Sequence, residues 1–198
     1  ALRRGVTGHR IFGLSIAPIE AGIPLDEQFG LLNQSISSGF LPPQVEAQSY
    51  THLGYLYRAT DLNKAHQCFV KSLEIAKQQK NTPSMIRAMD SIAFNCILQG
   101  EWDEAIKYSN EGIKLSKGAV NFGLPSLLKH RGWAFTNKGH LNFALQSVQQ
   151  GLNLYRDHQD DGEVIRLTRR LAEIQDKQGR WAISNSLLQN KIREDEEL

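Results

Sequence analysis

Large apolar residues recur along this sequence at intervals of 37 to 40 residues. The five that mark the interval are Leu25, Leu62, Trp102, Leu141 and Trp181. Each is followed eleven residues later by Ile or Leu, and the residues three and seven positions on are mostly small or apolar. These offsets place the side chains on one stripe of a helix with about 3.6 residues per turn. The pattern predicts a helix that begins near each marker and buries this stripe against neighbouring helices.

A partner helix is predicted ahead of each of these helices. A small residue stands eight or nine positions before four of the markers, which lets two antiparallel helices approach closely. These small residues are Gly54, Ala93, Gly132 and Ala172. Glycine stands two positions before three of the markers and is typical of a helix C-terminus, because it tolerates positive φ. These glycines are Gly100, Gly139 and Gly179. Each unit is therefore predicted to be a helical hairpin, and the chain an all-α protein whose antiparallel hairpins stack as an α-solenoid.

The order of residues within a unit resembles the tetratricopeptide-repeat (TPR) family. The order is a small residue, a larger residue three positions on, glycine, the apolar marker and then alanine. It is clearest in residues 92–113 and, without the glycine, in 53–69. The standard repeat of that family has about 34 residues. The period here is about five residues longer, which resembles the long-repeat variant of about 40 residues. The resemblance implies a TPR-like superhelix whose concave groove binds partner proteins.

The two ends of the chain depart from the pattern. We expect residues 1–24 to be an irregular N-terminal segment or a partial first repeat, because Pro18 falls inside the helix that the pattern requires there and proline in a helix interior costs ~3 kcal/mol. Residues 25–198 are expected to form the helical repeat domain, with about four and a half repeats. Polar residues such as Asn185 and Lys191 suit a capping role for the last unit, and the acidic end at 193–198 is expected to fray.

Composition and charge narrow the class of protein. The chain has 198 residues, of which 40% are hydrophobic, so it can build a core. Lys and Arg number 23 and Asp and Glu number 21, so no global basic field favours nucleic acid. No apolar run approaches the ~20 residues that span a bilayer. Cys68 and Cys96 are too few for a disulfide framework, so we expect buried thiols in a soluble cytoplasmic protein.

No residue pattern predicts catalysis. The six histidines lack the spacing of a zinc site, and His66 is expected to be a half-buried packing residue. The acidic residues around 157–163 fail the spacing of a calcium loop, and the glycines near residue 5 lack the Lys-Ser/Thr ending of a phosphate loop. We therefore expect no enzymatic activity, no metal and no cofactor.

The first helices of the hairpins would line the concave groove. An aromatic residue recurs there at one repeat position, and arginines and lysines surround it, opposed on that face by Asp90 and Glu173. The candidate partner-binding residues are Tyr55, Arg58, Arg87, Phe94, Lys129, Trp133, Asn137, Arg166, Arg169 and Arg170. They favour an acidic peptide with apolar anchors, because arginines and aromatic residues predominate in binding hot spots. A competing interpretation is that the rings fill space between helices and the arginines form an ordinary solvated face.

We expect a non-enzymatic protein–protein interaction module, a scaffold or adaptor that holds a peptide or helix of a partner in the groove. An alternative is a ligand- or peptide-sensing domain of a bacterial signalling or transcription regulator. Self-association through the N-terminal segment is a further alternative use of the surface. A nucleic-acid partner would use the basic residues between Arg166 and Arg180, but the acidic C-terminal end disfavours it.

Overall fold

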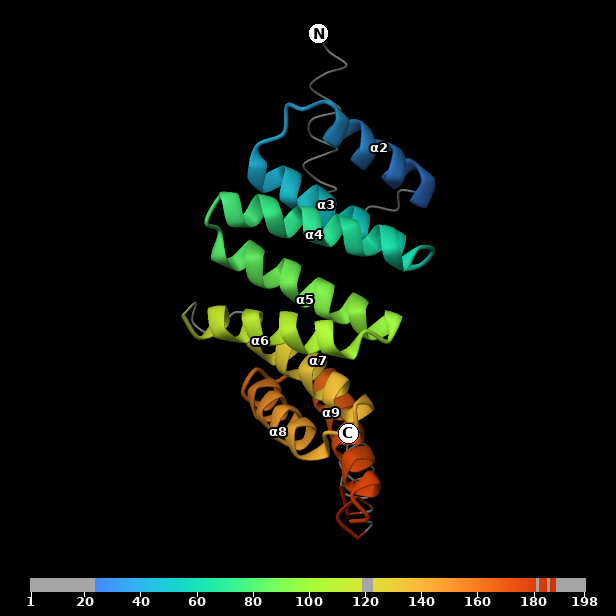
Figure 1. Cartoon of the computed structure of the whole chain (residues 1–198), viewed down its shortest axis with the longest axis vertical. Helices are drawn as coiled ribbons and strands as arrows, with labels where there is room; N and C mark the ends of the chain where they lie inside the picture. Colours follow the sequence, from blue (N-terminus) through green and yellow to red (C-terminus); the bar gives the residue numbers. More distant parts are fainter. Residues whose placement is uncertain (1–23, 119–122, 181, 185, 188–198) are drawn as a thin grey trace. The chain divides into compact units, whose positions relative to one another are not determined.

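The computed structural model describes residues 24–118, 123–180, 182–184 and 186–187 (Figure 1). The predictions for residues 1–23, for the marker Trp181 and for the acidic C-terminal end lie outside the described residues. Within them the chain is helical and contains no strand. The helices are α2 (Leu25–Ser37), α3 (Pro43–Arg58), α4 (Leu62–Gln78), α5 (Thr82–Gln99), α6 (Trp102–Gly118), α7 (Leu124–Asn137), α8 (Leu141–Asp157) and α9 (Asp161–Lys177).

The even-numbered helices are the predicted second helices of the repeats. Helices α2, α4, α6 and α8 begin at Leu25, Leu62, Trp102 and Leu141, the four markers that the structure describes. Most of their predicted stripe is buried, although the marker Leu25 is 65% exposed at the start of α2. At the third position after the marker the alanines of α4, α6 and α8 are fully buried, and at the seventh Phe69 is fully buried in α4. The period therefore predicted both where these helices start and which side faces the core.

The helix ends have the local chemistry that the sequence indicates. Gly100, Gly139 and Gly179 adopt φ values of 77°, 76° and 73°, the left-handed region that glycine enters without a steric penalty. At the helix starts, the side chains of Asp61 and Asp160 accept hydrogen bonds from backbone amides of α4 and α9. Such capping satisfies backbone donors that have no partner within the helix.

The chain divides into two compact units, residues 1–95 and residues 96–198, with the boundary inside α5. In the first unit, Leu32, Leu53 and Cys68 form a core with the half-buried Tyr57 and other apolar side chains of α2 and α3. Helices α3 and α4 lie side by side (Figure 1). Their close approach depends on Gly54, because a Cβ there would lie within 2.8 Å of the Phe69 ring.

The second unit contains α6 to α9 and the end of α5. Its core joins α8 and α9 through Ala144, Val148, Leu152, Leu167, Leu171 and Ile174. Polar contacts recur between equivalent repeat positions. Lys138, three residues before one marker, pairs with Asp103, which follows the previous marker. In the next repeat Gln178 donates to the side chain of Asn142 at 3.1 Å.

Both cysteines are free thiols in the buried part of the fold, as expected. Cys68 is 8% exposed and Cys96 is fully buried. Burial raises the pKa of Cys68 to about 11 and, together with Glu101, that of Cys96 to about 12. Both thiols therefore stay protonated at neutral pH, the state that suits a small packing side chain. His66 is half-buried, as predicted.

Candidate functional site

Helices α3 and α5 are the first helices of two consecutive repeats, and each presents one row of side chains on the same side of the first unit. On α3 the row is Gln44, Gln48, Thr51 and Tyr55, and on α5 it is Ser84, Arg87, Ser91 and Phe94. Spacings of three and four residues keep each row on one side of its helix. We call these two rows, with Arg58 at the end of α3, the first-helix face of the first unit.

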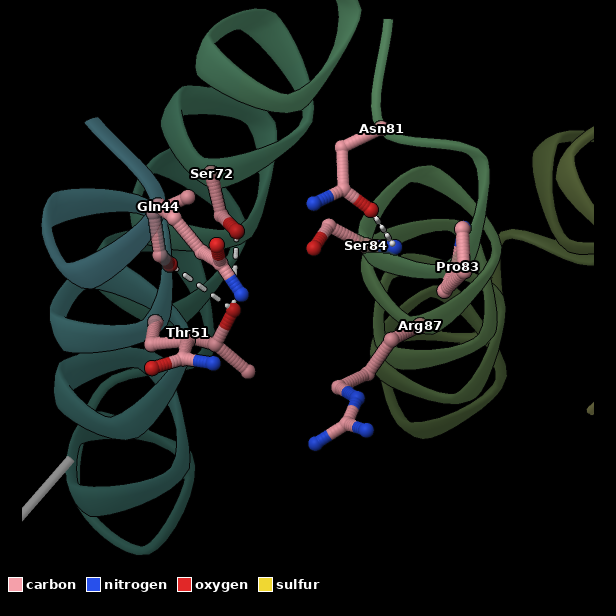
Figure 2. A pocket seen from close by; sticks show the side chains of 9 residues that line it. Gln44, Thr51, Ser72, Asn81, Pro83, Ser84 and Arg87 are labelled. Carbon is pink, nitrogen blue, oxygen red and sulfur yellow. Dashed lines mark hydrogen bonds between the residues drawn. The ribbon is translucent and has the colours of Figure 1, made fainter. Parts of the chain in front are cut away.

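A polar cavity of about 250 Å³ lies between the N-terminal halves of these rows (Figure 2). Its lining residues are Gln44, Ala47, Gln48, Thr51, Ser72, Asn81, Pro83, Ser84 and Arg87. In Figure 2 the guanidinium of Arg87 extends from α5 into the space that faces Thr51 on α3. The lining supplies amide, hydroxyl and guanidinium groups and includes no carboxylate. Such a cavity suits a ligand with hydrogen-bonding groups and negative charge.

Hydrogen bonds within the chain fix part of this lining. The Thr51 and Ser72 hydroxyls lie 2.8 Å apart, and the Thr51 hydroxyl also donates to the carbonyl of Ala47 at 3.1 Å. On the opposite wall the Asn81 side-chain oxygen accepts from the Ser84 amide at 3.1 Å. That contact caps α5 and directs the Asn81 amide nitrogen into the space that Figure 2 shows. The walls are thus ordered, whereas the Arg87 side chain is exposed.

The C-terminal halves of the two rows meet in a cluster around Arg58. The guanidinium carbon of Arg58 lies 4.8 Å from the ring centres of both Phe69 and Phe94 and 5.2 Å from that of Tyr55. Arg58 also donates to the Ser91 carbonyl at 3.1 Å, and the Tyr55 hydroxyl lies 3.0 Å from the Ser91 hydroxyl. Burial lowers the pKa of Arg58, while Tyr55 and Asp90 act in the opposite direction.

This cluster shows how three predicted site residues are used. Tyr55, Arg58 and Phe94 come together, as the repeat position indicates, and they fasten α3 to α5. Arg58 and Phe94 are half-buried. Tyr55 remains 40% exposed and presents a ring to solvent beside the cavity. Arg87 stands apart from the cluster, in the cavity wall.

On the first-helix face of the second unit, acidic residues pair with the predicted cations. Glu163 of α9 accepts from Lys129 at 2.9 Å and from Arg166 at 2.5 Å. Arg170 pairs with Glu173 at 2.6 Å. The expectation that only Asp90 and Glu173 oppose the basic residues is therefore wrong. Glu163 lies at the start of α9 and reaches across to Lys129 of α7.

The remaining predicted residues of this unit hold three different positions. Arg170 stacks over the half-buried Trp133 ring at 4.7 Å. Asn137 is exposed and donates to the Trp133 carbonyl within α7. Arg169 is exposed on α9. The unit thus has an aromatic–arginine pair but a smaller excess of positive charge than the sequence suggests.

Sequence reasoning missed the cavity-lining residues Gln44, Asn81 and Ser84 as candidates for a site. Gln44 lies four residues before Gln48 and Ser84 three residues before Arg87, so helical spacing places these two on the same side of their helices. Asn81 precedes α5, and helical spacing gives no such signal for it. What sequence could not supply is the distance between α3 and α5, which creates the cavity.

Over the described ranges, no three His, Cys, Asp or Glu side chains are grouped so as to hold a metal ion. None of the described helices combines the length and apolar character needed to cross a membrane.

Comparisons with known proteins locate the fold. No protein-family model matches the sequence, and no curated protein has a significantly similar sequence. Solved structures do match. BtubC (BKLC) from P. vanneervenii superposes with a TM-score of 0.82 at 14% identity, over 97% of this chain and 81% of that chain.

Two other solved structures extend this likeness. TPR-like repeats of a putative kinesin light chain from Podosopora anserina give a TM-score of 0.70 at 13% identity, covering 95% of this chain and 92% of that chain. Aspartyl phosphate phosphatase F from Bacillus subtilis gives 0.76 at 10% identity, covering 87% of this chain and 48% of that chain. At such identities the likeness concerns the fold. This chain therefore has the TPR-like α-solenoid fold that its long repeat predicts.

Proposed function

We propose that this chain is a non-enzymatic protein–protein interaction module whose first-helix face binds an acidic peptide segment of a partner. The observation that carries the proposal is the polar cavity of about 250 Å³ between α3, α4 and α5, with Arg87 in its wall and no carboxylate in its lining. A cavity of this size holds one side chain of a partner rather than a whole ligand. A glutamate or aspartate side chain there would accept hydrogen bonds from Arg87 and from the neighbouring amides.

Tyr55 supplies the apolar part of the same site. It lies one helical turn after Thr51, a lining residue, and its ring is held by the Phe69 ring at 5.4 Å and by the Ser91 hydroxyl. A held ring loses little conformational entropy when a partner packs on it, which is why tyrosine contributes strongly to interfaces. The proposed ligand therefore carries an acidic side chain for the cavity and, nearby, an apolar side chain for Tyr55.

In the second unit we propose that a partner segment is bound by Lys129, Trp133, Asn137, Arg166, Arg169 and Arg170. Glu163 and Glu173 neutralise part of their charge, so this surface is proposed to hold the partner chiefly through the exposed Asn137 and Arg169 and the stacked Trp133. Lys129 and Glu163 are only 25% and 13% exposed, so we propose that the exposed Arg166, rather than Lys129, exchanges its carboxylate partner for one of a bound peptide.

Selection of binders from a displayed library of random peptides tests the proposal. We expect the selected sequences to share an acidic residue close to an aliphatic or aromatic residue. Replacing Arg87 by Gln should weaken the binding of a selected peptide by about tenfold, because a charge-assisted hydrogen bond is lost. Replacing the peptide's acidic residue by its amide should cause a similar loss, and the two changes together should cost little more than either alone.

Arg156→Gln is the matched control, since Arg156 is exposed at the end of α8 and lies outside the cavity lining. Its affinity for the peptide should stay within about twofold of the unchanged protein. Tyr55→Ala should weaken binding without altering the acidic preference. Selected peptides without acidic residues, or equal losses from Arg87→Gln and Arg156→Gln, would contradict the proposal.

A further inference from the structure

A second and larger cavity, of about 500 Å³, opens in the second unit between α6, α7 and α8. It differs in composition from the polar cavity of the first unit. Leu124 and Leu128 of α7 and Ile113 of α6 are buried and form an apolar floor. Polar side chains of α8, including Gln146 and Gln150, form one wall and are exposed. The volume lies within the range of roughly 300–1,000 Å³ that small-molecule sites occupy.

Arg131 lies in this lining and is the unusual group of the cavity. It is half-buried, and burial alone lowers its pKa. Its Nε donates to the Ser147 hydroxyl at 3.0 Å, and its Nη1 donates to the Asn110 side-chain oxygen at 3.2 Å. Both acceptors are neutral. A guanidinium has five N–H donors, so these two bonds hold the group in place and leave donors for a ligand.

The charge of the lining is one-sided. Arg131 and Lys117 are both cationic, and the lining residues include no Asp or Glu. A partly buried cation is ordinarily balanced by a nearby carboxylate, because removing its water without a countercharge costs free energy. The apolar floor and the uncompensated cation together define a ligand that has an aliphatic body and one anionic end.

We propose that this cavity binds a small aliphatic carboxylate, such as a medium-chain fatty acid, with its carboxylate on Arg131 and its chain on Leu124 and Leu128. A guanidinium and a carboxylate match in geometry and can form two parallel hydrogen bonds. The floor removes the aliphatic chain from water, which contributes free energy in proportion to the buried area. The site lies between α6, α7 and α8 and is independent of the first-helix cavity proposed to bind a peptide.

Titration of the whole chain with octanoate, followed by two-dimensional NMR, tests the proposal. We expect saturable shifts at Leu124, Leu128 and Arg131. Octanol, which keeps the chain but has no charge, and acetate, which keeps the charge but has no chain, should each bind at least about tenfold more weakly. Equal binding of octanoate and octanol, or no saturable shift with octanoate, would overturn the proposal.

Two substitutions assign the charge of the site. Arg131→Gln should weaken the binding of octanoate by about tenfold. Because Arg131 also ties α7 to its neighbours, a second variant avoids that dependence: Gln150→Glu places a carboxylate in the exposed wall and should repel the ligand by a similar factor. Gln78→Glu is its control, with the same change of charge at an exposed residue of α4 outside the lining.

The control should leave the dissociation constant within about twofold. Equal effects of Gln150→Glu and Gln78→Glu would overturn the assignment of the cavity. N-acetyl-leucine, which carries a carboxylate, a short aliphatic side chain and an amide, provides the last comparison. If it bound more tightly than octanoate, the occupant would be a peptide C-terminus and the proposal of a free acid would be wrong.

Discussion

The guanidinium of Arg58 stacks on the ring of Phe94, with 4.8 Å between its central carbon and the ring centre. Arg58 ends α3 and Phe94 lies in α5, so the contact joins the first helices of two consecutive repeats. The same guanidinium faces the rings of Tyr55 and Phe69 and bonds to the Ser91 carbonyl. One cation thus holds the walls of the candidate site at a fixed separation.

This arrangement predicts that Arg58 cannot be replaced by lysine without loss. Lysine keeps the charge but lacks the planar group that stacks on several rings and donates to a carbonyl. We expect Arg58→Lys to lower the free energy of unfolding by about 1–2 kcal/mol. Arg156→Lys, at an exposed position, should change it by less than about 0.5 kcal/mol. Urea unfolding followed by circular dichroism measures both, and similar values for the two variants would show that the cluster does not hold the helices.

A second prediction concerns Gly54. Alanine is the better helix former by roughly 0.5–1 kcal/mol, so replacing a helical glycine by alanine ordinarily raises the free energy of unfolding. At Gly54, however, the new Cβ would lie 2.7–2.8 Å from atoms of the Phe69 ring, and Phe69 is fully buried. We expect Gly54→Ala to destabilise the protein by about 1–3 kcal/mol through overpacking.

Gly30 provides the matched control, because it lies in α2 and a Cβ there would meet nothing within 4 Å. Gly30→Ala should raise the free energy of unfolding by roughly 0.5–1 kcal/mol. The opposite signs of the two changes are the expected result in chemical denaturation. A stabilising Gly54→Ala would mean that α3 and α4 can separate at little cost.

A third prediction concerns the turn after α8. Gln159 has φ of 57°, a conformation that disfavours residues with a Cβ. Gln159→Gly should therefore stabilise the protein by up to ~1 kcal/mol. Gly139, with φ of 76° and open space around it, gives the reverse test: Gly139→Ala should destabilise by about 1 kcal/mol through backbone strain. Thermal unfolding should show the two shifts in opposite directions, and shifts of the same sign would contradict this account of the turns.

The fourth prediction is a slow reaction of both thiols. With pKa values of about 11 for Cys68 and about 12 for Cys96, almost no thiolate is present at pH 8. Ellman's reagent should modify the native protein far more slowly than the protein unfolded in urea. Rapid modification of the native chain would show that these side chains open to solvent more often than their burial implies.

The same shifts set a dependence of stability on pH. The thiols have a higher pKa in the folded state than the ordinary value of 9.0, so folding favours their protonated form. The stability that the two protonated thiols contribute is fully present below pH 9 and falls as the pH rises from 9 towards 11–12. It falls because the thiols lose their protons at a lower pH in the unfolded chain than in the folded one. Replacing both residues by alanine should reduce this alkaline slope in unfolding experiments between those pH values.

Much of the fold could be predicted from local sequence. The markers Leu62 and Trp102 begin α4 and α6, and Gly100 and Gly139 take the left-handed conformation expected of them. These features depend on helical spacing and on the conformational freedom of single residues, which neighbours in sequence express directly. The candidate site was harder to predict from the sequence. Glu163 was missed as the partner of Lys129, since the pair is 34 residues apart and forms only when α7 and α9 pack together.

The sequence alone determined the repeat, the starts and ends of the helices and the side of each helix that is buried, because these follow from period, capping and backbone preference. Tertiary structure decided what the exposed sides do. It turned Arg58 into a fastening between repeats, paired Lys129 with Glu163, and left Arg87 and Arg131 in the walls of two cavities without carboxylates. The reason is physical: charge balance and cavity shape depend on distances between helices, and those distances are set by packing rather than by the order of residues.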